Sequence, residues 1–282
     1  MKITLWRLVY FYAFLFICTS CEKSGGDTIK PDAIKPDEPV RPACLLTEIN
    51  SGDRGQSSKY YYDANDKLLR IEKFNKGSNQ APYAITITYE YDAKGKILKA
   101  NYDYDGVPKY YISYEYDAKG RLIKATDYVL NNVQHDLYRY ALYEYTAASL
   151  VARKVNHFVF GVIGNTSVGS ETYEYKNGDV SKIQMYSSSG VEAGSIEITY
   201  DDKASIYSSL PQVYTSPIAS SHNIVTYELK DTKGSTIINN PYSVNSSTYS
   251  YEYNEQGFPI KQVRKDFTGR VLEKALITYT CK

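Results

Sequence analysis

Three kinds of side chain in this sequence could do chemistry: histidines, regularly spaced glutamates, and tyrosines in unusual number. His135, His157 and His222 lie far apart, without the short spacing that metal ligands take within one motif. The 282 residues contain no Gly-x-Ser-x-Gly elbow, no phosphate-binding glycine loop and no His-Glu-x-x-His motif. We therefore predict no cofactor and no metal site, and interpret the histidines as exposed strand or loop residues.

One stretch begins like a calcium-binding loop. Asn101, Asp103 and Asp105 alternate and Gly106 follows, as in the first half of an EF-hand loop. The twelfth position, where such a loop needs a bidentate glutamate, is Ile112. We interpret Asp105-Gly106 as a turn between two strands instead.

The glutamates recur once per repeat of the sequence. They are Glu90, Glu115, Glu144, Glu174, Glu228 and Glu252. A glycosidase needs two carboxylates at a defined separation, and repeated positions give no reason to single out a pair. We therefore predict that the protein is not an enzyme, with an enzyme acting on envelope glycans as one alternative.

Tyrosine is the remaining candidate, with 31 copies. Its ring supplies apolar area and its hydroxyl needs a partner, which suits both packing and binding. We interpret the tyrosines at alternate positions of each repeat as packing. Those beyond the repeat positions are candidate ligand contacts: Tyr104, Tyr110, Tyr138, Tyr186 and Tyr242.

The tyrosines also mark a repeat. Nine marks end at Tyr62, Tyr91, Tyr116, Tyr145, Tyr175, Tyr200, Tyr227, Tyr253 and Tyr279, at steps of 25 to 30 residues. Such a period is typical of an architecture in which one supersecondary unit is copied. Two copies, residues 89–100 and 114–125, are almost superimposable: YEYDAKGKILKA and YEYDAKGRLIKA.

Each unit predicts a β-hairpin. Residues 85–91 alternate strictly, so that Ile85, Ile87, Tyr89 and Tyr91 share one face and Thr86, Thr88, Glu90 and Asp92 the other. Asp-Ala-Lys-Gly is a turn in which glycine supplies positive φ. We predict an all-β fold, an antiparallel up-and-down meander of about 14–18 strands closing into a barrel, with an open curved sheet as the alternative. Residues 203–221 lack this rhythm and predict an irregular excursion.

The first residues predict export. Lys2 and Arg7 precede an apolar run at residues 8–17 that is too short to span a bilayer. Small residues then lead to Cys21, which resembles the lipobox of bacterial lipoproteins. The resemblance implies that residues 1–20 are a signal peptide and that Cys21 carries lipid; an ordinary signal cut leaving a stray Cys21 is the alternative.

Residues 21–43 predict a lipidated cysteine and a proline-rich linker, and residues 44–282 a single β-repeat domain. Removing residues 1–20 removes Lys2, Arg7 and no acidic residue, so the formal charge falls from +1 to −1. Nucleic-acid binders show a strong basic excess, and none is present here.

Two cysteines remain at the ends of the repeat array. An exported protein lies in a compartment that permits disulfides, so we predict that Cys44 and Cys281 are bonded and close the sheet, with two unpaired thiols as the alternative. Neighbouring end strands must run antiparallel, which requires an even strand number. The expected Cα separation is about 4.4–6.8 Å.

The repeat resembles the tyrosine–aspartate repeats of Rhs-type bacterial surface proteins. The lipobox, proline linker, Tyr-x-Tyr hairpins and terminal Ile277-Thr-Tyr-Thr-Cys-Lys282 together resemble a family of Bacteroidetes lipoproteins of unknown function. That resemblance implies a porin-like β-barrel over residues 44–282 and brings no catalytic residue.

We expect a non-catalytic lipoprotein, anchored to the outer membrane on its periplasmic or outer side, that acts as a binding or structural module. The candidate partners are a glycan or an envelope protein, in addition to the membrane. A transmembrane porin-like channel is a further alternative, because strands of this length can span a bilayer. The oligomeric state and the ligand stay open.

The first test concerns Cys21. Cys21→Ser should abolish fatty-acid labelling and release the protein from membranes, because the thiol is the attachment point. Metabolic labelling and membrane fractionation measure this, and unchanged labelling of the variant would contradict the prediction.

Overall fold

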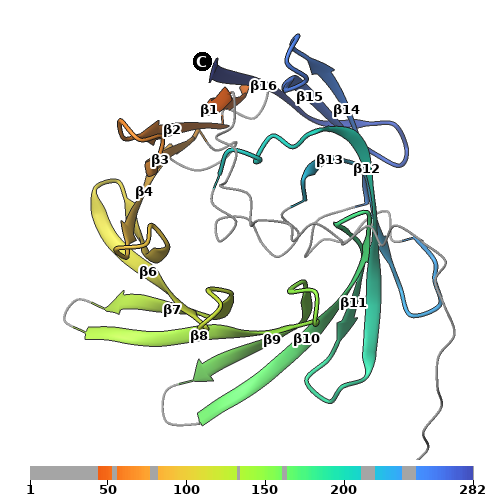
Figure 1. Ribbon diagram of the computed structural model, residues 1–282. Coiled ribbons are helices and arrows are strands. Elements are labelled where there is room, and N and C mark those ends of the chain that lie inside the picture. Colours follow the sequence, from red (N-terminus) through yellow and green to blue (C-terminus); the bar gives the residue numbers. More distant parts are fainter. Residues whose placement is uncertain are drawn as a thin grey trace, which may run out of the picture. The chain divides into compact units, whose positions relative to one another are not determined.

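The computed structural model describes residues 44–52, 56–76, 82–131, 134–160, 164–210, 220–236 and 246–281. They form sixteen antiparallel strands, and the sheet closes where β1 pairs with β16 (Figure 1). The strands are β1 Cys44–Ser51, β2 Gln56–Tyr62, β3 Leu68–Asn75, β4 Tyr83–Tyr91, β5 Ile97–Tyr104, β6 Val107–Tyr116, β7 Leu122–Asn131, β8 Gln134–Tyr145, β9 Val151–Phe160, β10 Gly164–Lys176, β11 Asp179–Tyr186, β12 Glu192–Ala204, β13 His222–Lys230, β14 Ser247–Tyr253, β15 Pro259–Asp266 and β16 Val271–Cys281.

The predicted all-β meander is confirmed. Its strand number is even and lies within the predicted range, and the alternative of an open curved sheet is wrong. The signal peptide, Cys21 and the linker up to residue 43 lie outside the described residues and stay predictions. No helix in the described ranges has the length and apolar character needed to cross a membrane.

The seam between the first and last strands carries the disulfide. Cys44 lies opposite Cys281, and the register continues with Leu45 opposite Thr280 and Ile49 opposite Ile277. A disulfide joins the two cysteines, as predicted, with their Cα atoms 3.9 Å apart. This separation is shorter than the predicted range, and the two residues face each other directly across the seam.

The turns after β2, β4, β6, β8 and β14 share one hydrogen-bond pattern. In the turn after β4, the Asp92 N–H donates to the Lys96 carbonyl (2.8 Å) and the Gly95 N–H to the Asp92 carbonyl (3.0 Å). Asp92 Oδ1 accepts from the N–H groups of Lys94 and Lys96 (both 2.8 Å). Gly95 has φ +81°, which a residue with a Cβ rarely adopts. The Asp-Ala-Lys-Gly motif thus closes the hairpin by itself.

These turns lie at one end of the barrel, which we call the turn rim; the opposite end is the far rim. Cys44 and Cys281 also lie at the turn rim, because β1 runs away from it and β16 returns to it. Asp105-Gly106, the predicted turn between strands, is confirmed as the β5–β6 connection and lies at the far rim.

The predicted face of β4 is confirmed, but a β-bulge follows each turn. Ile87 and Tyr89 are buried and Glu90 is exposed. Tyr91 pairs with Ile97 while Glu90 pairs with Lys99, so that Leu98 is the extra residue and points outward, 44% exposed. The same shift follows the turns after β6 and β8. The bulge therefore decides which residues of the second strand face the lumen.

A tyrosine hydroxyl joins each of several hairpins to the hairpin before it. We call Tyr91, Tyr116, Tyr145, Tyr175 and Tyr200 the rim tyrosines. Their hydroxyls donate to the carbonyls of Leu68, Ile97, Leu122, Val151 and Val180, at or next to the start of the preceding odd-numbered strand. The distances for Tyr116 and Tyr145 are 2.8 and 2.7 Å. Burial raises the pKa of Tyr116 to about 12, because the phenolate would lose its hydration.

Loss of the disulfide should weaken the fold without abolishing it. The hydrogen-bonded ladder between β1 and β16 remains when Cys44 and Cys281 are both changed to serine. The chain-entropy contribution of so long a loop is at most about 5 kcal/mol, so the melting temperature should fall while the β-type dichroism at room temperature persists. An unchanged melting temperature, or a chain unfolded at room temperature, would contradict this expectation.

Removal of one rim hydroxyl should destabilise the barrel measurably. Tyr116→Phe and Tyr145→Phe each leave a half-buried carbonyl without its donor, so each should lower the free energy of unfolding by about 1 kcal/mol. Denaturant unfolding measures the change. Tyr128→Phe is the control, because its ring stacks on Tyr111 on the outer face and its hydroxyl makes no hydrogen bond within the described part of the chain.

Candidate binding site in the lumen

An apolar cluster covers the inner face of β1–β5 and β16 in the half of the lumen next to the turn rim. Seven of its members are 4% exposed or less: Leu46, Leu68, Ile71, Ile87, Ile97, Ala100 and Ile277. Ile206 and Leu210, from the segment that follows β12, pack into the same cluster. Strand residues and a segment that enters from the turn rim thus occupy this sector of the lumen together.

That segment belongs to the predicted irregular excursion at residues 203–221. β12 runs to Ala204 and β13 begins at His222, and residues 205–210 form no strand, as predicted. Residues 211–219 lie outside the described residues. Asn223, 3% exposed, holds the entry: its Oδ1 accepts from the Ile206 N–H (2.9 Å) and its Nδ2 donates to the Ala204 carbonyl (2.9 Å).

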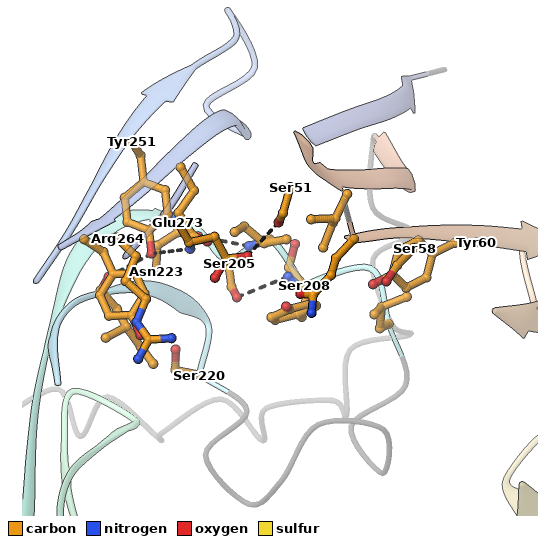
Figure 2. Close-up of a pocket in the computed structure, with 18 of the residues that line it drawn as sticks. Ser51, Ser58, Tyr60, Ser205, Ser208, Ser220, Asn223, Tyr251, Arg264 and Glu273 are labelled. Atoms are coloured by element: carbon orange, nitrogen blue, oxygen red, sulfur yellow. Dashed lines mark hydrogen bonds between the residues drawn. The ribbon is translucent and has the colours of Figure 1, made fainter. Parts of the chain in front are cut away.

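A cavity of about 870 Å³ lies in the lumen beside this segment, lined by polar side chains, tyrosine rings and a few aliphatic residues (Figure 2). Its hydroxyl groups come from Ser51, Ser57, Ser58, Ser205, Ser208, Ser220, Ser221, Tyr60, Tyr102, Tyr207, Tyr249 and Tyr251. Lys73, His222, Arg264 and Glu273 add charged or titratable groups. The volume falls within the range of about 300–1,000 Å³ that small-molecule sites occupy.

Arg264 and Glu273 face the cavity as cross-strand partners on β15 and β16. Each is held by a serine: Arg264 Nε donates to Ser247 Oγ (3.0 Å), and Glu273 Oε1 accepts from Ser51 Oγ (2.6 Å). The ion pairs among the described residues do not include one between them. The two side chains therefore present a planar cation and a carboxylate, side by side and preoriented, to whatever fills the cavity.

Two further groups shape the same wall. Gln262 Nε2 donates to the Tyr251 hydroxyl (3.2 Å), which in turn donates to the Ile224 carbonyl (2.8 Å). Lys73 on β3 also lines the cavity, and burial lowers its pKa because the ammonium loses water. The lining therefore combines donors, acceptors and aromatic rings.

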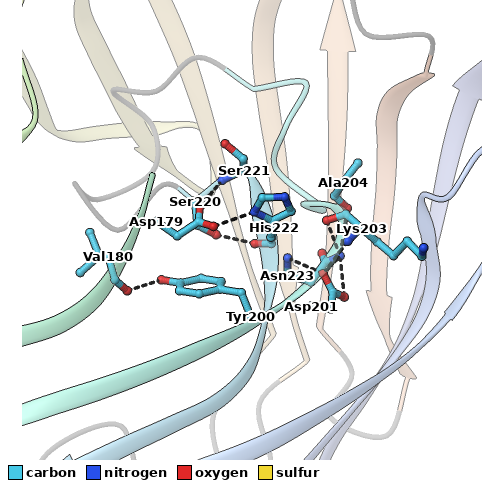
Figure 3. Close-up of polar contacts among 10 residues, drawn as sticks. All are labelled: Asp179, Val180, Tyr200, Asp201, Lys203, Ala204, Ser220, Ser221, His222 and Asn223. Carbon is cyan, nitrogen blue, oxygen red and sulfur yellow. Dashed lines mark hydrogen bonds and ion pairs between the residues drawn. The ribbon is translucent and has the colours of Figure 1, made fainter. Parts of the chain in front are cut away.

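His222 is not the exposed strand or loop residue that the sequence predicts. It is half-buried, and its Nδ1 lies 2.6 Å from Asp179 Oδ2 (Figure 3). Asp179 Oδ1 accepts from the Ser221 N–H (2.9 Å). Ser220 Oγ donates to the backbone carbonyl of His222, not to the ring, so these residues do not form a nucleophile–base pair.

The other histidines differ from one another. His157 stacks on Tyr140 on the outer face, with ring centroids 4.5 Å apart. The side chain of His135 lies outside the described part of the structure. Within the described ranges, no group of three or more His, Cys, Asp or Glu residues could hold a metal ion.

Two more carboxylates face the lumen from the opposite wall. Asp127 on β7 pairs with Arg139 on β8. Glu171 on β10 lies 3.6 Å from Lys154 Nζ and accepts from the Tyr173 hydroxyl (2.5 Å). Both carboxylates are thus committed to cations within the wall.

The tyrosines that the sequence predicts to contact a ligand lie in different parts of the structure. Tyr104 and Tyr110 lie close together on the inner face, with ring centroids 6.2 Å apart. Tyr138 is exposed and meets Phe158 edge-on at 5.5 Å, and Tyr186 is half-buried at the end of β11. Tyr242 and the predicted lipidation site Cys21 lie outside the described residues.

Sequence analysis missed Lys73, Arg264 and Glu273. A signal existed in the alternation of β15, where Gln262 and Arg264 alternate with Lys261 and Val263. Alternation assigns two faces but does not say which one points inward once a bulge has shifted the register.

No protein-family model matches this sequence, and no curated protein does. Two solved structures share the fold. A porin-like protein from Bacteroides uniformis ATCC 8492 is 14% identical with a TM-score of 0.52, over 85% of this chain and 96% of that chain. A porin-like protein from Bacteroides vulgatus ATCC 8482 is 10% identical with a TM-score of 0.52, over 83% of this chain and 98% of that chain. At these identities the likeness shows the barrel fold and nothing about activity.

Proposed function

We propose that this protein is a lipid-anchored, non-catalytic protein of the cell envelope whose barrel binds a saccharide in the lumen. The observation that carries the proposal is the cavity of about 870 Å³, which is lined by hydroxyls, tyrosine rings, Arg264 and Glu273. The apolar cluster that includes Ile206 and Leu210 lies nearer the turn rim and forms one side of the lumen there.

The lining favours a saccharide over an apolar ligand. A sugar offers many hydroxyl groups, each both donor and acceptor, and C–H faces that pack on aromatic rings. Arg264 supplies donors, Glu273 supplies acceptors, and Tyr249 and Tyr251 supply ring surface in the same wall. Tyrosine and serine hydroxyls add groups that can serve in either role.

Two observations speak against the transmembrane channel. First, residues 205–210 enter the lumen and pack on the apolar cluster, so they take up part of the bore. Second, the outer face carries ion pairs within strands as well as beside the turns: Arg70–Glu72 lies within β3, and Glu90–Lys99, Glu115–Lys124, Glu144–Arg153 and Glu252–Lys261 lie near the turn rim. A lipid-facing band is apolar, and a Lys or Arg costs about 2–4 kcal/mol near its middle and about 0–1 kcal/mol near its edges.

The carboxylates favour binding over hydrolysis. A glycosidase needs one carboxyl that holds a proton and a second that acts as base or nucleophile. Asp127 and Glu171 are paired with Arg139 and Lys154, and Glu273 is held by Ser51. All three carboxylates therefore already have partners within the wall.

The order of the linker and β1 in the sequence supports an orientation of the barrel relative to the membrane. Residues 22–43 lead into Cys44 at the turn rim, so lipid on Cys21 would put that rim toward the membrane. Ser51, Gln56 and Glu273, which line the cavity, lie near the far rim. We propose that the ligand enters from the far rim, away from the membrane. The porin-like neighbours agree with a place in the envelope.

The proposal predicts that cavity substitutions weaken saccharide binding. Malto-, cello- and xylo-oligosaccharides, presented to the purified mature protein in calorimetry, should include at least one ligand. Arg264→Gln and Glu273→Gln should each weaken its binding by about tenfold or more, the equivalent of about 1.4 kcal/mol, because a buried polar contact loses its partner.

Arg153→Gln is the matched control. Arg153 lies on the outer face, 3.4 Å from Glu144, so its loss should leave the affinity unchanged. Equal effects of Arg264→Gln and Arg153→Gln, or no binding by the unaltered protein to any of the three series, would contradict the proposed function.

A further inference from the structure

Four tyrosines form a connected row on the inner face of β4, β5 and β6. Tyr83 stacks with Tyr104 (centroids 6.3 Å, interplanar angle 17°), Tyr104 meets Tyr110 at 6.2 Å, and Tyr110 stacks on Tyr102 (4.2 Å, 17°). We call these four residues the tyrosine row. Each is partly exposed rather than fully buried.

The row runs from the far rim to the cavity. Tyr83 begins β4 and Tyr104 ends β5, so both lie at the far rim. Tyr102 lies one step deeper on the same face of β5 and lines the cavity. A ligand that enters at the far rim along this wall passes the tyrosine row before it reaches Arg264 and Glu273.

The row departs from the repeat. On the strands that follow, the lumen-facing positions at comparable depth hold Asp127 and Arg139 on β7 and β8, and Lys154 and Glu171 on β9 and β10. The rim tyrosines have a structural task because their hydroxyls bind backbone carbonyls. The tyrosine row therefore needs a different explanation from the repeat.

The phenol groups of the tyrosine row stay in the neutral form. Burial raises the pKa of Tyr110 well above its usual range, and the neighbouring Tyr102 and Tyr104 raise it further. Neutral phenols are both donors and acceptors. A series of rings and neutral hydroxyls suits a chain of linked sugars, whose units repeat the same C–H faces and hydroxyl groups.

We propose that the tyrosine row is an extended subsite that binds the further units of an oligosaccharide whose terminal unit occupies the cavity. The inference rests on the proposed function and narrows the ligand from saccharides in general to oligomeric chains.

The test is the dependence of affinity on chain length. For the unaltered mature protein, calorimetry with disaccharides to hexasaccharides of the malto, cello and xylo series should show affinity rising with length by about tenfold in the series that binds, about 1.4 kcal/mol. Tyr110→Ala should remove the rise while leaving disaccharide affinity unchanged. Tyr104→Ala, at a residue nearer the rim, is a second variant if Tyr110→Ala does not fold.

Tyr111→Ala is the matched control. Tyr111 is the next residue along β6, and its ring stacks on Tyr128 on the outer face with centroids 4.7 Å apart. It should keep the length dependence. Affinity that is independent of length in the unaltered protein would overturn the inference and leave the proposed function intact, as would an equal loss for all lengths in Tyr110→Ala. Failure of every length to bind would overturn the proposed function itself.

Discussion

A sixteen-stranded barrel encloses more space than one layer of side chains can fill, and this protein meets that constraint differently at its two ends. At the turn rim, the rim tyrosines bind the carbonyl of the preceding hairpin, so each hairpin is fixed to its neighbour by a side chain as well as by the ladder. These rings line the rim, and aliphatic residues such as Ile71, Ile87 and Ile97 pack beside Tyr91 in one sector of the lumen. The bond repeats along much of the barrel because the sequence repeats.

The apolar cluster leaves polar positions nearer the far rim free for a ligand. The repeat alone does not fill the lumen, and a segment outside the repeat, residues 205–210, adds Ile206 and Leu210 to the cluster. With the apolar core placed there, the side chains nearer the far rim need not pack on one another. Polar groups such as Arg264 and Glu273 can then face a cavity, held by serines that satisfy part of their hydrogen-bonding capacity.

The repeat is also what made the fold predictable. Strict alternation from Ile85 to Tyr91 predicts a strand with one buried face, and the two cysteines at the ends of the array predict a closed seam. The bulges were not predictable, because the run after the turn reads as apolar throughout; Leu98 points outward only because the ladder gains a residue there. The pairing of His222 with Asp179 joins residues 43 positions apart, which no local pattern reveals.

The tyrosines fall into two groups, according to whether the fold needs a phenol at their position. Tyr116 and Tyr145 recur in the repeat and bind the backbone, so a change at either is a change in stability. Tyr104 and Tyr110 stand outside the repeat, and the backbone makes no demand for a phenol at their positions. Since neighbouring walls place Asp127, Arg139 or Lys154 at comparable depth, the fold tolerates several residue types there. A row of rings at positions where the fold does not need them is better explained by a ligand than by packing, and Tyr111, one residue away on the outer face, offers the comparison that separates the two.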